Sequence, residues 1–297
     1  MNRAVPLLVG LGVLATGIVA EAKTYRWVND QGVVVYSDQP PQVRLGDKER
    51  DALIAEALEI SGTKKEIESI PAQIRAQFDA RQTPVRAEDK ARVIRILTDA
   101  FRPDVLYSAV RTAFRSNFDA QRMDVVMEKL RSPLFRKITA MELAANEPGA
   151  RQDLERFAMG LQGDIPAPAR VSLVQRQEAV MRSAELQIDM AIIAAQAVGR
   201  SLEPVLSPTQ RPTGREMDAA VSKLRSQQDA LTRAALVRWL YTYRALTTEE
   251  LAQYVEFNES DAGRWFAATQ RKGLIEAMRA AMDTAARHIA SAFPAKR

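Results

Sequence analysis

The sequence predicts a mainly α-helical protein, a multi-helix bundle with a β-hairpin at its N-terminus. Three observations predict this fold class. Glycine is scarce, with 13 in 297 residues, whereas residues that favour helices are abundant. From about residue 46 onward, apolar residues recur at helical spacing. Only residues 24–41, TYRWVNDQGVVVYSDQPP, show the alternation of period two that is typical of strands.

The first 22 residues have the pattern of a cleaved signal peptide. Arg3 precedes an apolar run of 13 residues (7–19), and the sequence AEA at 20–22 offers a cleavage site. Thirteen helical residues span about 20 Å, which is less than the roughly 30 Å of a bilayer core. An uncleaved membrane anchor is the alternative. We therefore expect export, with cleavage after Ala22, and a periplasmic location.

Composition limits the partners of an exported chain. The protein has no cysteine, so its core must stabilise it without disulfides. The formal net charge is +5, and residues 75–122 hold ten Lys or Arg against six Asp or Glu. Outside the cytoplasm, the available polyanions are lipid headgroups and envelope polymers, and we expect no nucleic-acid partner. Residues 75–122 are either a solvated helix face or a peripheral contact with an anionic membrane surface.

A β-hairpin module is predicted for residues 23–45. Tyr25 and Trp27 alternate with polar neighbours in the first strand, and NDQG at 29–32 predicts a four-residue turn. The double proline at 40–41 prevents further strand pairing. Because a lone hairpin is only marginally stable in water, the module must pack against the helices or against a partner.

The same hairpin supplies the candidate partner-binding residues, Tyr25, Trp27 and Tyr36. Their rings give the hairpin an aromatic surface that could receive a strand or stack on a sugar. The alternative is that this surface packs onto the helical body. We expect the partner, if there is one, to be an envelope protein or polymer.

Start and stop signals divide the rest of the chain into helices. Gly62 predicts a helix end, and TKKE at 63–66 has the spacing of a capping box for the next helix. Ser132-Pro133 and TTEE at 247–250 are further start signals. Pro71 predicts a break or kink, and the last helix is expected from about Asp261.

Two segments are predicted as connections between helices. GLQGDIPAPA at 160–169 is predicted as a linker, and the proline-rich segment 203–214 as a loop. We therefore expect two helical subdomains, 46–160 and 161–297. An apolar stripe from Val180 to Val198 is predicted for the second one.

A faint internal repeat relates the two predicted subdomains at an offset of 128 residues. In each copy a capped helix leads to a serine-containing break, followed by an arginine, Arg136 or Arg264, on the next helix. Gene duplication and convergent helix boundaries are both open explanations.

Two family resemblances follow from these motifs. YRWVNDQGVVVYSDQPP closely resembles a short N-terminal domain of unknown function found in many Gram-negative envelope proteins. The helical body more loosely resembles an uncharacterised family of exported helical proteins, although LRSPLFRK lacks the glycine and NESDAGRW the proline of that family's turn. These resemblances imply location and architecture, and neither brings a catalytic residue or a cofactor.

Candidate catalytic residues are few. His288, the single histidine, is expected on the polar side of the last helix. Glu256 and Glu259 share a helix face and could act as general acid and base, but such pairs are also routine on exposed helices. Trp239 and Tyr243 can share one face and are expected in the core. No metal or cofactor site is predicted.

The sequence therefore favours a non-enzymatic binding or adaptor protein of the cell envelope. An envelope hydrolase that uses carboxyl groups, or a protein that binds anionic lipid, are the alternatives.

Overall fold

A computed structural model describes residues 25–28, 33–37, 46–80, 86–147, 149–202, 211 and 213–293. It divides the chain into two compact units, residues 1–44 and 45–297. The predicted signal peptide, the turn at 29–32 and the double proline lie outside the described residues, as do residues 203–210 and 212 of the predicted loop.

In the N-terminal unit, two short strands form an antiparallel pair. Strand β1 (Tyr25–Val28) pairs with β2 (Val34–Ser37), and Arg26 lies opposite Tyr36 in the register. The period-two prediction agrees with these strands. The complete hairpin module, with its turn, stays a prediction.

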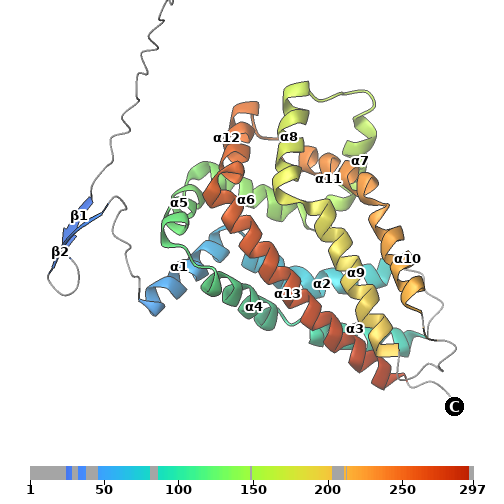
Figure 1. The fold of residues 1–297 in the computed structure, drawn as a ribbon. Helices are drawn as coiled ribbons and strands as arrows, with labels where there is room; N and C mark the ends of the chain where they lie inside the picture. Colours follow the sequence, from blue (N-terminus) through green and yellow to red (C-terminus); the bar gives the residue numbers. More distant parts are fainter. Residues whose placement is uncertain are drawn as a thin grey trace, which may run out of the picture. The chain divides into compact units, whose positions relative to one another are not determined.

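The second unit is helical, and it gives the chain its mainly α-helical class (Figure 1). In chain order its helices are α1 (Asp47–Ile60), α2 (Thr63–Ala80), α3 (Ala87–Ala100), α4 (Pro103–Ser116), α5 (Ala120–Leu130), α6 (Pro133–Ala145), α7 (Ala150–Gly160), α8 (Pro168–Met181), α9 (Ser183–Leu202), α10 (Gly214–Arg225), α11 (Gln228–Thr242), α12 (Thr248–Glu259) and α13 (Asp261–Ala292).

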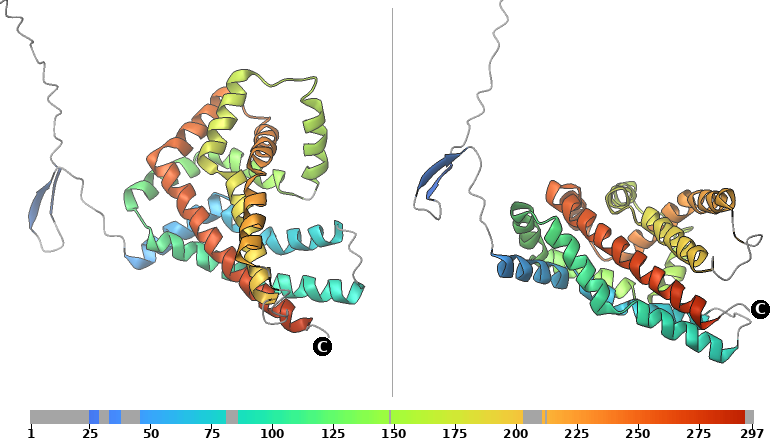
Figure 2. Two further views of the ribbon diagram at one scale, coloured as in Figure 1. Left: turned by 45° about the vertical axis from the view of Figure 1, so that its right-hand side comes forward. Right: turned by 60° about the horizontal axis from the view of Figure 1, so that its bottom comes forward.

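Helix α13 is the central element of the helical unit. It runs between α4 and α9, and it also contacts α3, α5, α8 and α12 (Figures 1 and 2). With 32 residues it is about 48 Å long. The predicted subdomains 46–160 and 161–297 are therefore parts of one compact helical unit, because α13 packs on helices from both.

The contact between α13 and α4 depends on Gly273. A Cβ atom at this position would lie 2.9 Å from the Cα atom of Val110 and 2.9 Å from the Cβ atom of Ala113. Any larger residue would therefore push the two helices apart. Gly273 allows the longest helix to lie directly against the backbone of α4.

The predicted helix starts of the repeat are confirmed at two pairs of caps. Asp119 and Thr247 accept hydrogen bonds from backbone amides of α5 and α12, and Ser132 and Ser260 do the same for α6 and α13. Each cap satisfies an amide that has no partner within its helix. The offset of 128 residues is thus an offset of helix boundaries, and gene duplication and convergence both stay open as explanations of it.

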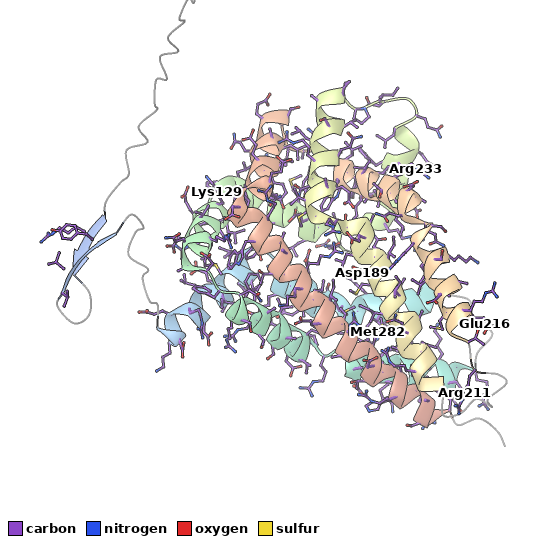
Figure 3. The ribbon with its side chains drawn as sticks, in the orientation of Figure 1. Lys129, Asp189, Arg211, Glu216, Arg233 and Met282 are labelled. Atoms are coloured by element: carbon purple, nitrogen blue, oxygen red, sulfur yellow. The ribbon has the colours of Figure 1, made fainter. Side chains whose placement is uncertain are left out.

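A sharp bend joins α8 to α9 at Arg182. This residue has a left-handed backbone conformation with φ of 51°. Its carbonyl oxygen accepts a hydrogen bond of 3.1 Å from Arg271 of α13. Arg271 also donates over 2.8 Å to Asp189, which Figure 3 labels on α9. The predicted stripe from 180 to 198 is divided by this bend, and Val198 is 52% exposed.

Two local predictions need correction. Helix α2 continues through Pro71, so the predicted break there is wrong, and a kink stays a prediction. Glu66 does not complete a capping box with Thr63: its backbone amide donates to the carbonyl oxygen of Gly62, and its carboxyl group accepts a hydrogen bond from Asn146. The stop at Gly62 is confirmed by its φ of 79°.

Candidate functional site

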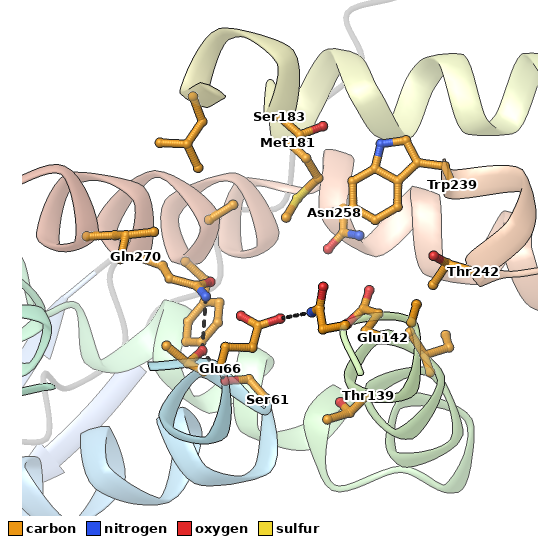
Figure 4. Close-up of a pocket in the computed structure, with 18 of the residues that line it drawn as sticks. Ser61, Glu66, Thr139, Glu142, Met181, Ser183, Trp239, Thr242, Asn258 and Gln270 are labelled. Carbon is orange, nitrogen blue, oxygen red and sulfur yellow. Dashed lines mark hydrogen bonds between the residues drawn. The ribbon is translucent and has the colours of Figure 1, made fainter. Parts of the chain in front are cut away.

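A cavity of about 540 Å³ lies inside the helical unit (Figure 4). Residues of α2, α6, α9, α11, α12 and α13 form most of its lining, together with Met181 at the end of α8. Apolar side chains make up most of the wall, among them Ile67, Ile70, Ile138, Leu186 and Leu274. Its volume is in the range of small-molecule pockets.

Two carboxyl groups from different helices face this cavity. Glu66 of α2 and Glu142 of α6 both line it, and in Figure 4 their side chains extend into the same part of it. Glu66 Oε1 accepts a hydrogen bond of 3.2 Å from Asn146 Nδ2. Asn146 Oδ1 in turn accepts from Arg238 of α11. This chain of contacts connects Glu66 to the one arginine that lines the cavity.

Two tyrosines hold Glu142. Its Oε1 atom accepts hydrogen bonds of 2.6 Å from the hydroxyl of Tyr243 and 2.8 Å from that of Tyr254. Tyr243 is fully buried and Tyr254 nearly so, which fixes both donors. Glu142 therefore has a defined position although it borders open space.

The surroundings keep both carboxyl groups from ionising readily. Burial, followed by the charge of Glu142, raises the pKa of Glu66 from 4.5 to about 7, against the opposing charge of Arg238. Burial also raises the pKa of Glu142, although its bonds from Tyr243 and Tyr254 act in the opposite direction. Near pH 7, Glu66 is thus about half ionised.

An aromatic wall borders the cavity. Trp239 lines it and stacks on Tyr243, with ring centroids 5.5 Å apart and planes at 6°. The indole Nε1 of Trp239 donates to Glu178 over 2.9 Å. Glu178 is buried and also accepts from Ser183 and from the backbone amide of Ala184. It therefore connects this wall to the bend that begins α9.

The predicted sharing of a face by Trp239 and Tyr243 is confirmed by this stacking, and Tyr243 lies in the core as expected. Sequence reasoning missed Glu66 and Glu142 as site residues. The one local signal for Glu142 is that it is the only acidic residue of α6, in the apolar segment ITAMELAA.

The carboxyl pair predicted on α12 is not brought together at a pocket. Glu256 is exposed, and neither it nor Glu259 lines the cavity. Glu259 accepts from Arg176 of α8 over 2.9 Å, and this bond keeps its pKa below the usual value. A general acid needs the opposite shift, so the environment of Glu259 does not suit that role. His288 is exposed, as expected.

The structure describes only part of the predicted aromatic surface at the N-terminus. Tyr36 is 65% exposed, and its hydroxyl accepts a hydrogen bond of 3.1 Å from Arg26 Nε. The side chains of Tyr25 and Trp27 lie outside the description. Partner binding by these three residues stays a prediction.

Many basic side chains of the region 75–122 have partners in the helical unit. Arg86, Lys90, Arg102, Arg115 and Arg122 form ion pairs with nearby carboxylates. Such pairs reduce the positive charge that the region presents to an anionic surface. Contact of this region with a membrane stays a prediction.

The described residues contain no candidate for two other kinds of site. No group of three or more His, Cys, Asp or Glu side chains there is arranged to hold a metal ion. None of the described helices combines the length and apolar character needed to cross a bilayer.

Removing the hydroxyl of Tyr243 is expected to destabilise the protein. We expect Tyr243→Phe to lower the free energy of unfolding by about 1–2 kcal/mol, because Glu142 loses one of its two donors. Tyr241→Phe is the control, since the Tyr241 hydroxyl forms no hydrogen bond to the described residues. Urea denaturation of both variants tests this prediction. Equal decreases in their free energies of unfolding would contradict it.

Comparison with known proteins identifies only the N-terminal segment. A family model described as "Domain of unknown function (DUF4124)" matches residues 11–92. This match confirms the resemblance seen in residues 24–41 and extends to the first helices. No curated protein and no solved structure matches the chain. The looser resemblance of the helical body stays a prediction.

Proposed function

We propose that this is an exported, non-enzymatic binding protein of the bacterial cell envelope, whose helical unit holds a small amphiphilic ligand. The cavity of about 540 Å³ carries the proposal. Its walls are mainly apolar, and a few polar groups, among them Glu66, Glu142 and Asn146, converge on it. This combination is typical of small-molecule sites, in which apolar surface supplies affinity and the polar groups set orientation.

A cavity-filling variant tests ligand binding. Ala267 of α13 lines the cavity, whereas the next residue, Ala268, is exposed. We expect the neutral fluorescent probe N-phenyl-1-naphthylamine to bind the wild type and Ala268→Phe with one saturable site. Ala267→Phe should lose at least tenfold in affinity, because the ring takes the space of the probe. Circular dichroism verifies that both variants are folded.

Two results would contradict the proposal. One is the absence of saturable probe binding to the wild-type protein. The other is equal binding by folded Ala267→Phe and Ala268→Phe, which would place the probe outside the cavity.

The proposed location rests on the N-terminal sequence. The basic residue, the apolar run and the AEA sequence at 20–22 support export by a cleaved signal peptide to the periplasm. Mass spectrometry of the protein from periplasmic extracts should give a mature chain that begins at Lys23. An intact N-terminus in the membrane fraction would instead support an anchor.

The N-terminal strand pair is proposed as the contact with an envelope protein or polymer, through Tyr25, Trp27 and Tyr36. The exposed ring of Tyr36 supports this proposal. Affinity capture from solubilised envelopes should retain a partner with the wild type and lose it with Trp27→Ala. Retention of the same material by both proteins would count against the proposal.

A second candidate function is an envelope hydrolase, and one observation favours it. Glu66 has a pKa of about 7 beside a cavity, and a general acid needs a pKa near the working pH. Glycan and peptide substrates test this candidate. Turnover that disappears in Glu66→Gln would support it, and no turnover by the wild type would reject it.

A further inference from the structure

Glu66 and Glu142 place two acidic groups at one cavity without a cation beside them. Among the described residues, no Lys or Arg nitrogen lies within 4.0 Å of either carboxyl group. The arginine that lines the cavity, Arg238, is exposed and donates to Asn146 instead. Neither carboxyl group therefore has the directly bonded cation that normally accompanies buried carboxylates, although the charge of Arg238 acts on Glu66 from a greater distance.

Each carboxyl group also has one oxygen available to a ligand. The hydrogen bonds from Asn146 to Glu66 and from the two tyrosines to Glu142 all end on Oε1. Neither Oε2 atom accepts a hydrogen bond from the described residues. A ligand that donates hydrogen bonds and carries positive charge would satisfy both atoms at once.

The rest of the cavity suits an apolar chain. Ile67, Ile70 and Leu186 belong to its wall, and Trp239 presents an indole that is held by Glu178 and stacked on Tyr243. An aromatic ring beside a cation adds a favourable interaction with its π-electrons. The volume of about 540 Å³ admits a small molecule, not a folded partner.

We infer that the cavity binds a small aliphatic primary amine, with its ammonium group between Glu66 and Glu142 and its apolar chain against the isoleucine and leucine wall. This inference rests on the proposed binding function and names the class of ligand. An ammonium group has three donors, so two can reach the carboxyl oxygens. A carboxylate ligand would be repelled by the same two groups.

Binding of an amine is expected to release a proton. Glu66 must be ionised to attract the ammonium group, and its pKa of about 7 lies far below the value of about 10 at which a primary amine loses its charge. The charged and titratable groups around the two carboxyls are Arg238, Tyr243 and Tyr254, and both tyrosines have pKa values raised well above 10. Both tyrosines therefore stay neutral between pH 6 and pH 8, and the proton on Glu66 accounts for the expected change.

Calorimetric titration with three octyl compounds tests the inference. Octylamine, octanoate and octyl glucoside have alkyl chains of similar length, and their head groups are positive, negative and neutral in that order. At pH 8 we expect octylamine to bind at least tenfold more tightly than octyl glucoside, and octanoate to bind more weakly still. Octylamine affinity should fall about tenfold from pH 8 to pH 6, as Glu66 takes up its proton.

Three variants locate the ammonium group. Glu66→Gln should remove most of the preference for octylamine and the pH dependence, and Glu142→Gln should also reduce the preference. Glu256→Gln is the matched control, because Glu256 is exposed and does not line the cavity. Binding of octyl glucoside should change little in Glu256→Gln, and circular dichroism verifies that the other two variants are folded.

The outcomes separate this inference from the proposed function. If octyl glucoside binds and octylamine shows no preference, the amine inference is wrong and the binding function stands. If Glu256→Gln and Glu66→Gln affect octylamine equally, the inference is also wrong. If none of the three compounds binds, the inference and the proposed function both fail.

Discussion

Replacing Glu66 with glutamine is expected to stabilise the protein by up to about 3 kcal/mol at pH 8. The folded state raises the pKa of this group from 4.5 to about 7, at about 1.4 kcal/mol for each pH unit. Because the folded protein binds this proton more tightly than the unfolded chain, its stability falls as pH rises from about 4.5 to 7. Glutamine has a similar shape and no charge, so the variant avoids this loss.

The difference between the two proteins should depend on pH in a defined way. At pH 4 the carboxyl group is protonated in both states, so wild type and Glu66→Gln should have nearly equal free energies of unfolding. Urea denaturation at several pH values measures this difference. Arg115 lowers the pKa of Asp51, and Arg131 lowers that of Glu56. These groups change the free energy of unfolding at lower pH, and they do so equally in both proteins. If the difference in the free energy of unfolding is the same at pH 4 and pH 8, the pKa of Glu66 is not raised in the folded protein.

Gly263→Ala is expected to destabilise the protein by about 3 kcal/mol or more. Gly263 lies in the first turn of α13, where a Cβ atom would be 2.1 Å from the carbonyl oxygen of Phe257 and 2.8 Å from the Cα atom of Asn258. Both are backbone atoms of α12, so the clash can be relieved only by opening the corner between the two helices. The higher helix propensity of alanine, worth about 1 kcal/mol, offsets only a minor part of this loss of stability.

Gly199→Ala in α9 is the matched control. Its Cβ atom would meet the terminal methyl group of Met217 at 3.6 Å, which is an ordinary contact. The free energy of unfolding of this variant should rise by up to about 1 kcal/mol, from helix propensity alone. In denaturant titrations, we expect the free energy of unfolding to fall in Gly263→Ala and to rise in Gly199→Ala. Equal changes would show that the corner between α12 and α13 tolerates a side chain.

Helix boundaries were predictable because their signals are local. Asp119, Ser132 and Thr247 each accept from an amide three residues along the chain, so a short stretch of sequence contains both partners. The start signal TTEE at 247–250 is confirmed for the same reason, because the Glu250 carboxylate accepts from the Thr247 amide and completes a capping box.

The candidate site was not predictable, because its contacts are distant in the chain. Glu142 meets Tyr243 and Tyr254 from helices far along the sequence. The spacing of Thr63 and Glu66 matches a local capping box, yet packing directs the Glu66 side chain to Asn146 in the cavity. Here tertiary structure overrode a local pattern, which sequence alone could not reveal.

The bend at Arg182 was also missed. No glycine or proline marks it, and the apolar positions continue across it from Val180 to Ala184. Its left-handed conformation is supported by contacts from another helix, including the hydrogen bond from Arg271. Such support depends on the assembled fold.

The position of α13 has a consequence for the order in which the protein is made. This helix leaves the ribosome after α3, α4, α5 and α9, the helices that it packs against. Nascent chains that end before Asp261 should therefore be cut readily by protease, whereas chains that extend past Ala292 should resist. We expect the helices before α13 to stay loosely packed until it is made, which suits the passage through a membrane pore that the proposed export requires.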